Sequence, residues 1–144
     1  MLGSIHTIWL ADDDEDDLGL FKEALLDVAP DVELVSFVNG SEIINQLRSS
    51  PTLPDVVLLD INMPKKNGFD CLSEIKGDPK LSSLATIMWS TAANPNHAEQ
   101  AFQLGARLFV KKPDTFTRLT AITREILTAN LSDPYTYDNE FLIE

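Results

Sequence analysis

Hydrophobic residues form four short continuous runs along the chain, and a fifth run alternates with polar residues. The continuous runs are 8–11, 56–59, 86–89 and 108–110, and the alternating run is 33–38. Strands that helices cover on both faces have continuous apolar runs, whereas an edge strand alternates. The pattern therefore predicts four buried strands and one edge strand.

Each run is followed by a segment in which apolar residues recur at helical spacing. Ser41 is expected to cap the second helix, Asp78 with Pro79 to end the third, and Gly105 to close the fourth. Strands that alternate with helices need right-handed crossovers, so the pattern predicts an α/β fold with five β-α units in one open parallel sheet. The predicted stripes are Leu18, Phe21, Leu25 and Val28; Ile43, Ile44 and Leu47; Leu72 and Ile75; Ala98, Ala101, Phe102 and Gly105; and Leu119, Ile122, Ile126 and Leu127.

Length and composition predict a single domain over residues 1–131. The chain has 144 residues, of which 44% are hydrophobic, and this suits one core rather than two. Residues 132–144 carry acidic side chains and no basic ones, and we expect an acidic C-terminal tail with no effector domain. Its aromatic residues Tyr135, Tyr137 and Phe141 are expected to pack on the fifth helix or on a partner subunit.

Charge and cysteine content disfavour several classes of protein. The formal net charge is −12, which repels nucleic acid and anionic lipid, so neither partner is expected. Cys71 is the single cysteine, which excludes an intramolecular disulfide and a pair of thiol ligands. With neither a signal peptide nor a membrane-spanning run in the sequence, we expect a cytoplasmic protein.

Charged and hydroxyl residues follow four of the five predicted strands. Asp12 and Asp13 follow the first strand, Asp60 the third, Ser90 the fourth and Lys112 the fifth. The carboxyl ends of parallel strands meet at one edge of the sheet, where ligands bind. Three carboxylates placed together raise one another's pKa unless a cation compensates their charge. The sequence therefore predicts a cation site at this edge.

The chemistry of these oxygens favours Mg²⁺, which takes one or two carboxylates directly and keeps several waters. We expect Asp13 and Asp60 to be direct ligands, Asp12 to act through water, and Asn62 to supply a backbone carbonyl. A phosphoryl oxygen in the open metal position would also meet Lys112 and the hydroxyl of Ser90. Asp60 is then the candidate nucleophile.

Four segments together resemble the receiver domains of two-component response regulators. They are residues 10–13, 58–64, 90–91 and 112–113, in the order and spacing of that family over residues 5–130. The resemblance implies a doubly wound, flavodoxin-like fold with five helices and a five-stranded parallel sheet in the order 2-1-3-4-5. Within that family the chain resembles single-domain regulators like the chemotaxis regulator, and it shares features with those that partner phytochrome-like kinases.

The resemblance also implies a function: a response regulator that a sensor histidine kinase or phosphotransfer protein phosphorylates on aspartate, as a switch rather than a turnover enzyme. In this hypothesis Ser90 moves to the phosphoryl group, Phe109 turns inward, and the face of the fourth helix, fifth strand and fifth helix changes shape. Many members have tyrosine where this chain has Phe109. The implied roles are phosphoacceptor for Asp60, metal binding for Asp12 and Asp13, and phosphoryl binding and switching for Ser90, Thr91, Lys112 and Phe109.

Several readings of output and activity stay open at the level of sequence. Output can pass to a downstream protein target, through a homodimer on the switching face, or by onward transfer of the phosphoryl group. The alternative function is a small phosphatase or phosphotransferase of the haloacid-dehalogenase type, whose nucleophile would be Asp12 and which leaves Asp60 without a role. A third reading is a binding module of the same fold that works without phosphorylation.

Overall fold

Six parallel strands form one sheet in the computed structural model, which describes residues 5–91, 94–129 and 141–143. The sheet order is β2-β1-β3-β4-β5-β6, so the predicted α/β fold and the order of the five predicted strands are confirmed, and a short sixth strand is added beside β5. The strands are β1 (Thr7–Ala11), β2 (Glu33–Phe37), β3 (Val56–Asp60), β4 (Ala85–Ser90), β5 (Leu108–Lys111) and β6 (Leu142–Ile143).

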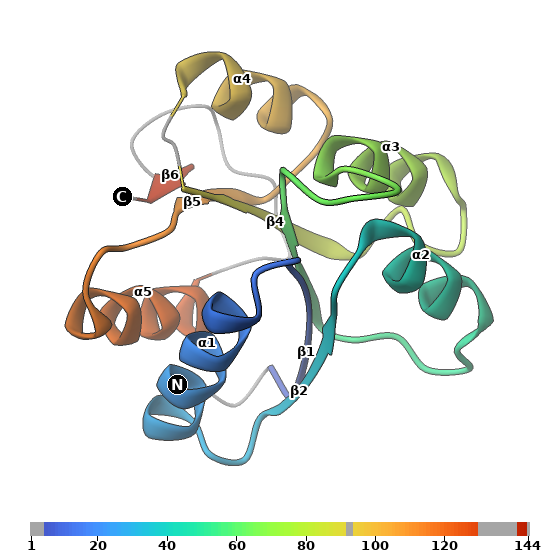
Figure 1. The fold of residues 1–144 in the computed structure, drawn as a ribbon. Helices are drawn as coiled ribbons and strands as arrows, with labels where there is room; N and C mark the ends of the chain where they lie inside the picture. Colours follow the sequence, from blue (N-terminus) through green and yellow to red (C-terminus); the bar gives the residue numbers. More distant parts are fainter. Residues whose placement is uncertain (1–4, 92–93, 130–140, 144) are drawn as a thin grey trace.

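Five helices cover the sheet in two layers, as Figure 1 shows: α1 and α5 lie on one face, and α2, α3 and α4 lie on the other. Among the described residues, no helix has the length and apolar character that crossing a bilayer requires. The helices are α1 (Glu15–Val28), α2 (Gly40–Ser49), α3 (Gly68–Gly77), α4 (Pro95–Gln103) and α5 (Phe116–Thr128).

Each face of the sheet has its own apolar cluster, because successive side chains of a strand point to opposite faces. In β1, Ile8 packs with Phe21 of α1 on the α1–α5 face, and Trp9 packs with Ile43 of α2 on the α2–α4 face. All four of these side chains are buried. The two-sided burial explains why the central strands read as continuous apolar runs.

The helix starts differ from prediction at α2. Asn39, and not Ser41, is the N-cap, and its side-chain oxygen accepts a hydrogen bond from the backbone N–H of Glu42 at 2.9 Å. Gly40 begins the helix at a close approach, since a Cβ there would lie 2.1 Å from the carbonyl oxygen of Lys66. A glycine is therefore needed inside the helix, and the capping role falls to the residue before it.

The predicted helix ends are confirmed. Asp78 is the C-cap of α3, and α4 ends with Gly105 just beyond it, at a φ of +95°. Glycine adopts this left-handed conformation without the steric cost of a side chain.

Phe141 lies on the other face of the sheet from the predicted one. Phe141 is fully buried on the α2–α4 face, with its ring centroid 5.3 Å from that of Phe102 in α4, so packing on α5 or on a partner is wrong for this residue. The backbone N–H of Phe109 donates to the carbonyl of Phe141 at 2.9 Å, and this pairing covers the edge of β5. Tyr135 and Tyr137 lie outside the described residues.

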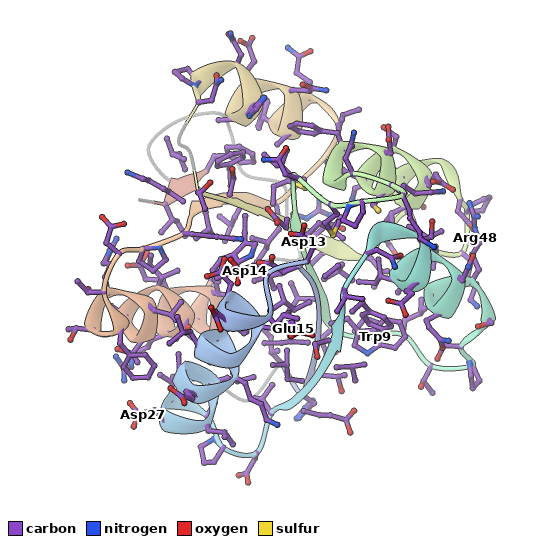
Figure 2. All side chains as sticks on the ribbon, in the orientation of Figure 1. Trp9, Asp13, Asp14, Glu15, Asp27 and Arg48 are labelled. Atoms are coloured by element: carbon purple, nitrogen blue, oxygen red, sulfur yellow. The ribbon has the colours of Figure 1, made fainter. Side chains whose placement is uncertain are left out.

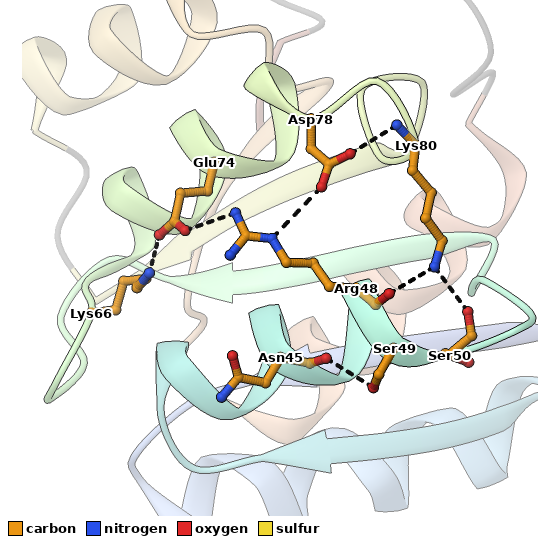
Figure 3. A network of polar contacts seen from close by, with 8 residues as sticks. All are labelled: Asn45, Arg48, Ser49, Ser50, Lys66, Glu74, Asp78 and Lys80. Atoms are coloured by element: carbon orange, nitrogen blue, oxygen red, sulfur yellow. Dashed lines mark hydrogen bonds and ion pairs between the residues drawn. The ribbon is translucent and has the colours of Figure 1, made fainter.

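A polar network joins α2 to α3 on the outer side of the α2–α4 face (Figure 3). Glu74 accepts from Arg48 at 3.0 Å and pairs with Lys66, and Arg48 also lies 3.6 Å from Asp78. Lys80 donates to the carbonyl of Arg48 at 2.9 Å, which links the end of α3 to α2. The side chains of this network are partly exposed, so each pair stabilises the fold only slightly.

Candidate functional site

Strand alternation brings four site side chains to the carboxyl edge of the sheet on the α1–α5 face. Asp12 continues the row of Ile8 and Leu10 just beyond β1, and Asp60 continues the row of Val56 and Leu58 at the end of β3. Because β1 and β3 are parallel neighbours, their ends lie side by side. Trp89 of β4 and Lys112, just beyond β5, follow the same alternation.

Asp12, Asp13 and Asp60 form a carboxylate cluster. Each offers an oxygen, and these oxygens all lie within 4.8 Å of one another. Asp12 and Asp60 are buried, whereas Asp13 is exposed, in the connection between β1 and α1 that Figure 2 labels. Opposite ligands of one Mg²⁺ are about 4.2 Å apart, because each binds at roughly 2.1 Å. The spacing and the oxygen chemistry of this cluster therefore fit a hard divalent cation.

Burial and neighbouring charges shift the pKa of Asp60 within the acid cluster. Burial, followed by the charge of Asp12, raises the pKa of Asp60 to about 7, and the nearby charge of Lys112 opposes this rise. A hydrogen bond from the backbone of Asn62 also lowers the pKa of Asp60. A bound cation would favour the ionised form, as it does for other carboxylate ligands.

Lys112 is the cation of the site. Its Nζ lies 2.7 Å from Asp12 Oδ2, 2.9 Å from Asp17 Oδ2 and 3.6 Å from Asp60 Oδ2. Burial would lower the pKa of Lys112, but hydrogen bonds to Asp12 and Asp17 together with the charges of Asp12 and Asp60 raise that pKa. The ammonium group is thus held charged beside Asp60 by Asp12, just beyond β1, and by Asp17 in the first turn of α1.

Asp12 is held by donors on both oxygens. Its Oδ1 accepts from the backbone N–H of Asp14 at 2.9 Å, and its Oδ2 accepts from the indole Nε1–H of Trp89 at 2.9 Å. Lys112 shares Oδ2 and lies 5.3 Å from the centroid of the Trp89 ring. Asp14 itself caps α1, with its Oδ1 accepting from the backbone of Asp16 at 2.9 Å.

The remaining predicted residues divide between the edge and the core. Ser90 is buried at the end of β4, and its carbonyl accepts from the backbone N–H of Lys112 at 2.7 Å. Thr91 and Asn62 are exposed at the same edge. The Asn62 carbonyl as a metal ligand stays a prediction.

Phe109 is a core residue in this conformation. It is fully buried on the α2–α4 face, and its role as a switch residue stays a prediction. The reason is strand alternation, which places Phe109 on the face opposite Leu108 and Val110 and in the same cluster as Phe141.

Two residues of the site were not predicted from sequence. In the sequence Asp17 is one member of an acidic run and Trp89 one member of an apolar strand run, so neither stands out as a site residue. Asp17 lies in the first turn of α1, beside the predicted metal pair, and Trp89 shares the alternation of Ile87. These positions were signals that the sequence offered. The partners of Asp17 and Trp89 lie far away in the chain, however, so the contacts can be found only in the folded structure.

Comparison with known proteins gives one family. The family model of the response regulator receiver domain matches residues 8–124. Response regulator Rcp1 of Synechocystis sp. is 29% identical over 111 residues, which are 73% of this chain and 75% of that protein.

Two crystal structures share the fold over most of the chain. The phosphorylated cyanobacterial phytochrome response regulator RcpA is 30% identical, with a TM-score of 0.80, and the match covers 90% of this chain and 100% of that one. The Mn²⁺-bound form of Rcp1 is 26% identical, with a TM-score of 0.78, and the match covers 88% of this chain and 98% of that one.

Proposed function

Because this chain belongs to the response regulator receiver domain family of two-component signalling, we propose that it accepts a phosphoryl group on Asp60 from a sensor histidine kinase or a phosphotransfer protein. The observation that carries the proposal is the position of Asp60. It lies between two other carboxylates and a buried ammonium group at the carboxyl edge of the sheet.

The proposed reaction is phosphoryl transfer. A carboxylate oxygen of Asp60 attacks the phosphorus of a phosphohistidine, the new O–P bond forms as the N–P bond breaks, and the imidazole leaves. Lys112, which lies 3.6 Å from Asp60, would meet one phosphoryl oxygen, and the hydroxyl of Ser90 would meet another. Mg²⁺ held by Asp12, Asp13 and Asp60 would offset the charge of the phosphoryl group, with Asn62 adding its carbonyl.

The proposed outcome is a switch in a protein-binding surface rather than turnover of a substrate. Ser90 moves toward the phosphoryl group, and this movement changes the packing of the already buried Phe109 in the neighbouring strand. Phe109 passes the change to the face of α4, β5 and α5, where a downstream protein or a second copy of the chain would bind. Thr91 directly follows Ser90, at the start of the connection from β4 to α4.

Similarity to phytochrome response regulators supports a phytochrome-linked kinase as the phosphoryl donor and the cytoplasm as the place of action. The haloacid-dehalogenase alternative is disfavoured because its nucleophile, Asp12, is fully buried and accepts hydrogen bonds on both oxygens.

The test is labelling by a small acyl phosphate donor with and without Mg²⁺, followed by mass spectrometry. We expect hydroxylamine-sensitive phosphate on Asp60 of the native chain only when Mg²⁺ is present, and no label on Asp60→Asn. Asp27→Asn, which changes an exposed acid on α1, is the matched control and should label like the native chain. A label mapped to Asp12, or full labelling of Asp60→Asn, would overturn the proposal.

A further inference from the structure

Trp89 connects β4 to the acid cluster through a single buried hydrogen bond. Its indole Nε1–H donates to Asp12 Oδ2 at 2.9 Å across 77 positions of sequence. Asp12 is 0% exposed and Trp89 is 2% exposed. A hydrogen bond from a neutral donor to a buried carboxylate is directional, and the carboxylate cannot replace it with water.

The indole is itself held in place. Trp89 is the penultimate residue of β4, and its ring packs edge-on against Phe21 of α1, with centroids 5.7 Å apart. The ammonium of Lys112 lies 5.3 Å from the centroid of the same ring. The strand and the helix thus fix the direction of the N–H, so the donor is preorganised toward Asp12.

The second donor to Asp12 Oδ2 is different in kind. Lys112 lies 2.7 Å from this oxygen, but it also faces Asp17 and Asp60, and its ammonium sits on a flexible stem. In the proposed reaction Lys112 must turn toward the phosphoryl group on Asp60. The rigid indole then remains as the donor to Oδ2, while the backbone N–H of Asp14 still donates to Oδ1.

We propose that Trp89 is a positioning residue of the acid site, whose indole N–H orients the Asp12 carboxylate for a bound divalent cation. This inference rests on the proposed function, since the cation site is part of the proposed phosphoryl-transfer machinery. Trp89 is also the register partner of Asp60 in the neighbouring strand, but the proposed role is exerted through its hydrogen bond to Asp12. Groups that orient the ligands of a metal commonly change its affinity by about tenfold or more when they are removed.

The chain supplies its own matched control in Trp9. This tryptophan is also buried in a central strand, but it lies on the α2–α4 face and packs against Phe37, with ring centroids 5.2 Å apart. Figure 2 shows Trp9 on the side of the sheet near α2. Trp9→Phe and Trp89→Phe therefore make the same chemical change on opposite faces of the sheet, and only the second removes the donor to Asp12.

The experiment measures Mg²⁺ affinity by titration calorimetry on the full chain and on both variants, each checked for folding by circular dichroism. We expect Trp89→Phe to weaken Mg²⁺ binding by about tenfold and Trp9→Phe to stay within twofold of the native chain. Equal affinity of the two variants would overturn the proposal.

A second measurement keeps the proposal testable if Trp89→Phe does not fold. In the ¹⁵N-labelled native chain, Mg²⁺ and the Asp12→Asn substitution should each shift the indole N–H resonance of Trp89 and leave that of Trp9 in place. An unmoved Trp89 resonance in both cases would contradict the inference. Neither readout needs phosphorylation, so a failure to label Asp60 refutes the proposed function separately.

Discussion

The same alternation of strand residues builds both faces of the sheet, but the two faces have different roles. On the α1–α5 face the apolar rows run on into Asp12, Asp60, Trp89 and Lys112, so the packing of this face leads directly to the polar site. On the α2–α4 face the row of β5 contains Phe109, which packs in one cluster with Phe141 from the far end of the chain. One face therefore supports the chemistry, and the other is completed by a remote segment.

The covering helices also differ between the faces. On the α1–α5 face the cluster is built mainly from the sheet and the two long helices, with Phe21 of α1 reaching Trp89. On the α2–α4 face, α2 and α3 are joined by ion pairs, and Phe141 packs beside Phe102 of α4. We conclude that a core substitution on the α1–α5 face should disturb the acid site more than a core substitution on the α2–α4 face does.

The largest expected difference comes from removing one buried phenylalanine on each face. Phe21→Ala should lower the free energy of unfolding by about 3–5 kcal/mol, because both a large ring and the support of Trp89 are lost. Phe141→Ala should cost at most about 2 kcal/mol, because the two-residue strand β6 can detach without global unfolding. Urea titrations with circular dichroism detection would compare the two variants. Equal losses of unfolding free energy would show that the segment with Phe141 and β6 is as integral to the fold as α1.

A smaller difference is expected from glycine substitutions. Gly68→Ala should destabilise the fold by about 1–3 kcal/mol, because the new Cβ would meet the Asp60 carbonyl at 2.3 Å and force the end of β3 to move. It should also slow the labelling of Asp60. Gly19→Ala, in α1 with no atom within 4 Å of the new Cβ, should instead stabilise by roughly 0.5–1 kcal/mol. A Gly68→Ala variant as stable as Gly19→Ala would contradict the close packing of the β3–α3 connection.

The smallest expected effect concerns the ion pairs of Figure 3. Glu74→Gln should lower stability by about 0.2–1 kcal/mol at neutral pH and low salt. The hydrogen bond and charge of Lys66 lower the pKa of Glu74 below its ordinary 4.5 despite partial burial, so this contribution is present above pH 4.5 and is lost as the pH falls through the lowered pKa. Thermal melts at several pH values and salt concentrations should show the two proteins converging in acid and in 1 M salt.

The matched control for that measurement is Glu125→Gln on the other face. Glu125 lies 3.4 Å from Arg118, and both side chains are more than 40% exposed. Its replacement should change the melting temperature less than Glu74→Gln does. A larger effect of Glu125→Gln would show that surface ion pairs matter more on the α1–α5 face than the geometry indicates.

The sequence was a good guide to elements and to the main site, and a poor one to partners distant in the chain. The strand runs and the residues at their carboxyl ends placed Asp12, Asp13 and Asp60 together, because parallel strands share an edge. The cap of α2 was missed because the approach of Lys66 to Gly40 is a tertiary contact. The place of Phe141 was missed for the same reason, since its partner strand lies more than 30 residues earlier.

What the sequence alone determined is the order of strands and helices and the set of side chains at the strand ends. Periods of 2 and 3.6 residues and short-range turn chemistry are written locally in the chain. The tertiary structure decided which face each side chain reached, and therefore that Trp89 and Lys112 share one oxygen of Asp12 while Phe141 covers the edge of β5. The physical reason is that hydrogen bonds and packing between remote segments depend on their relative placement in space, which local periodicity does not encode.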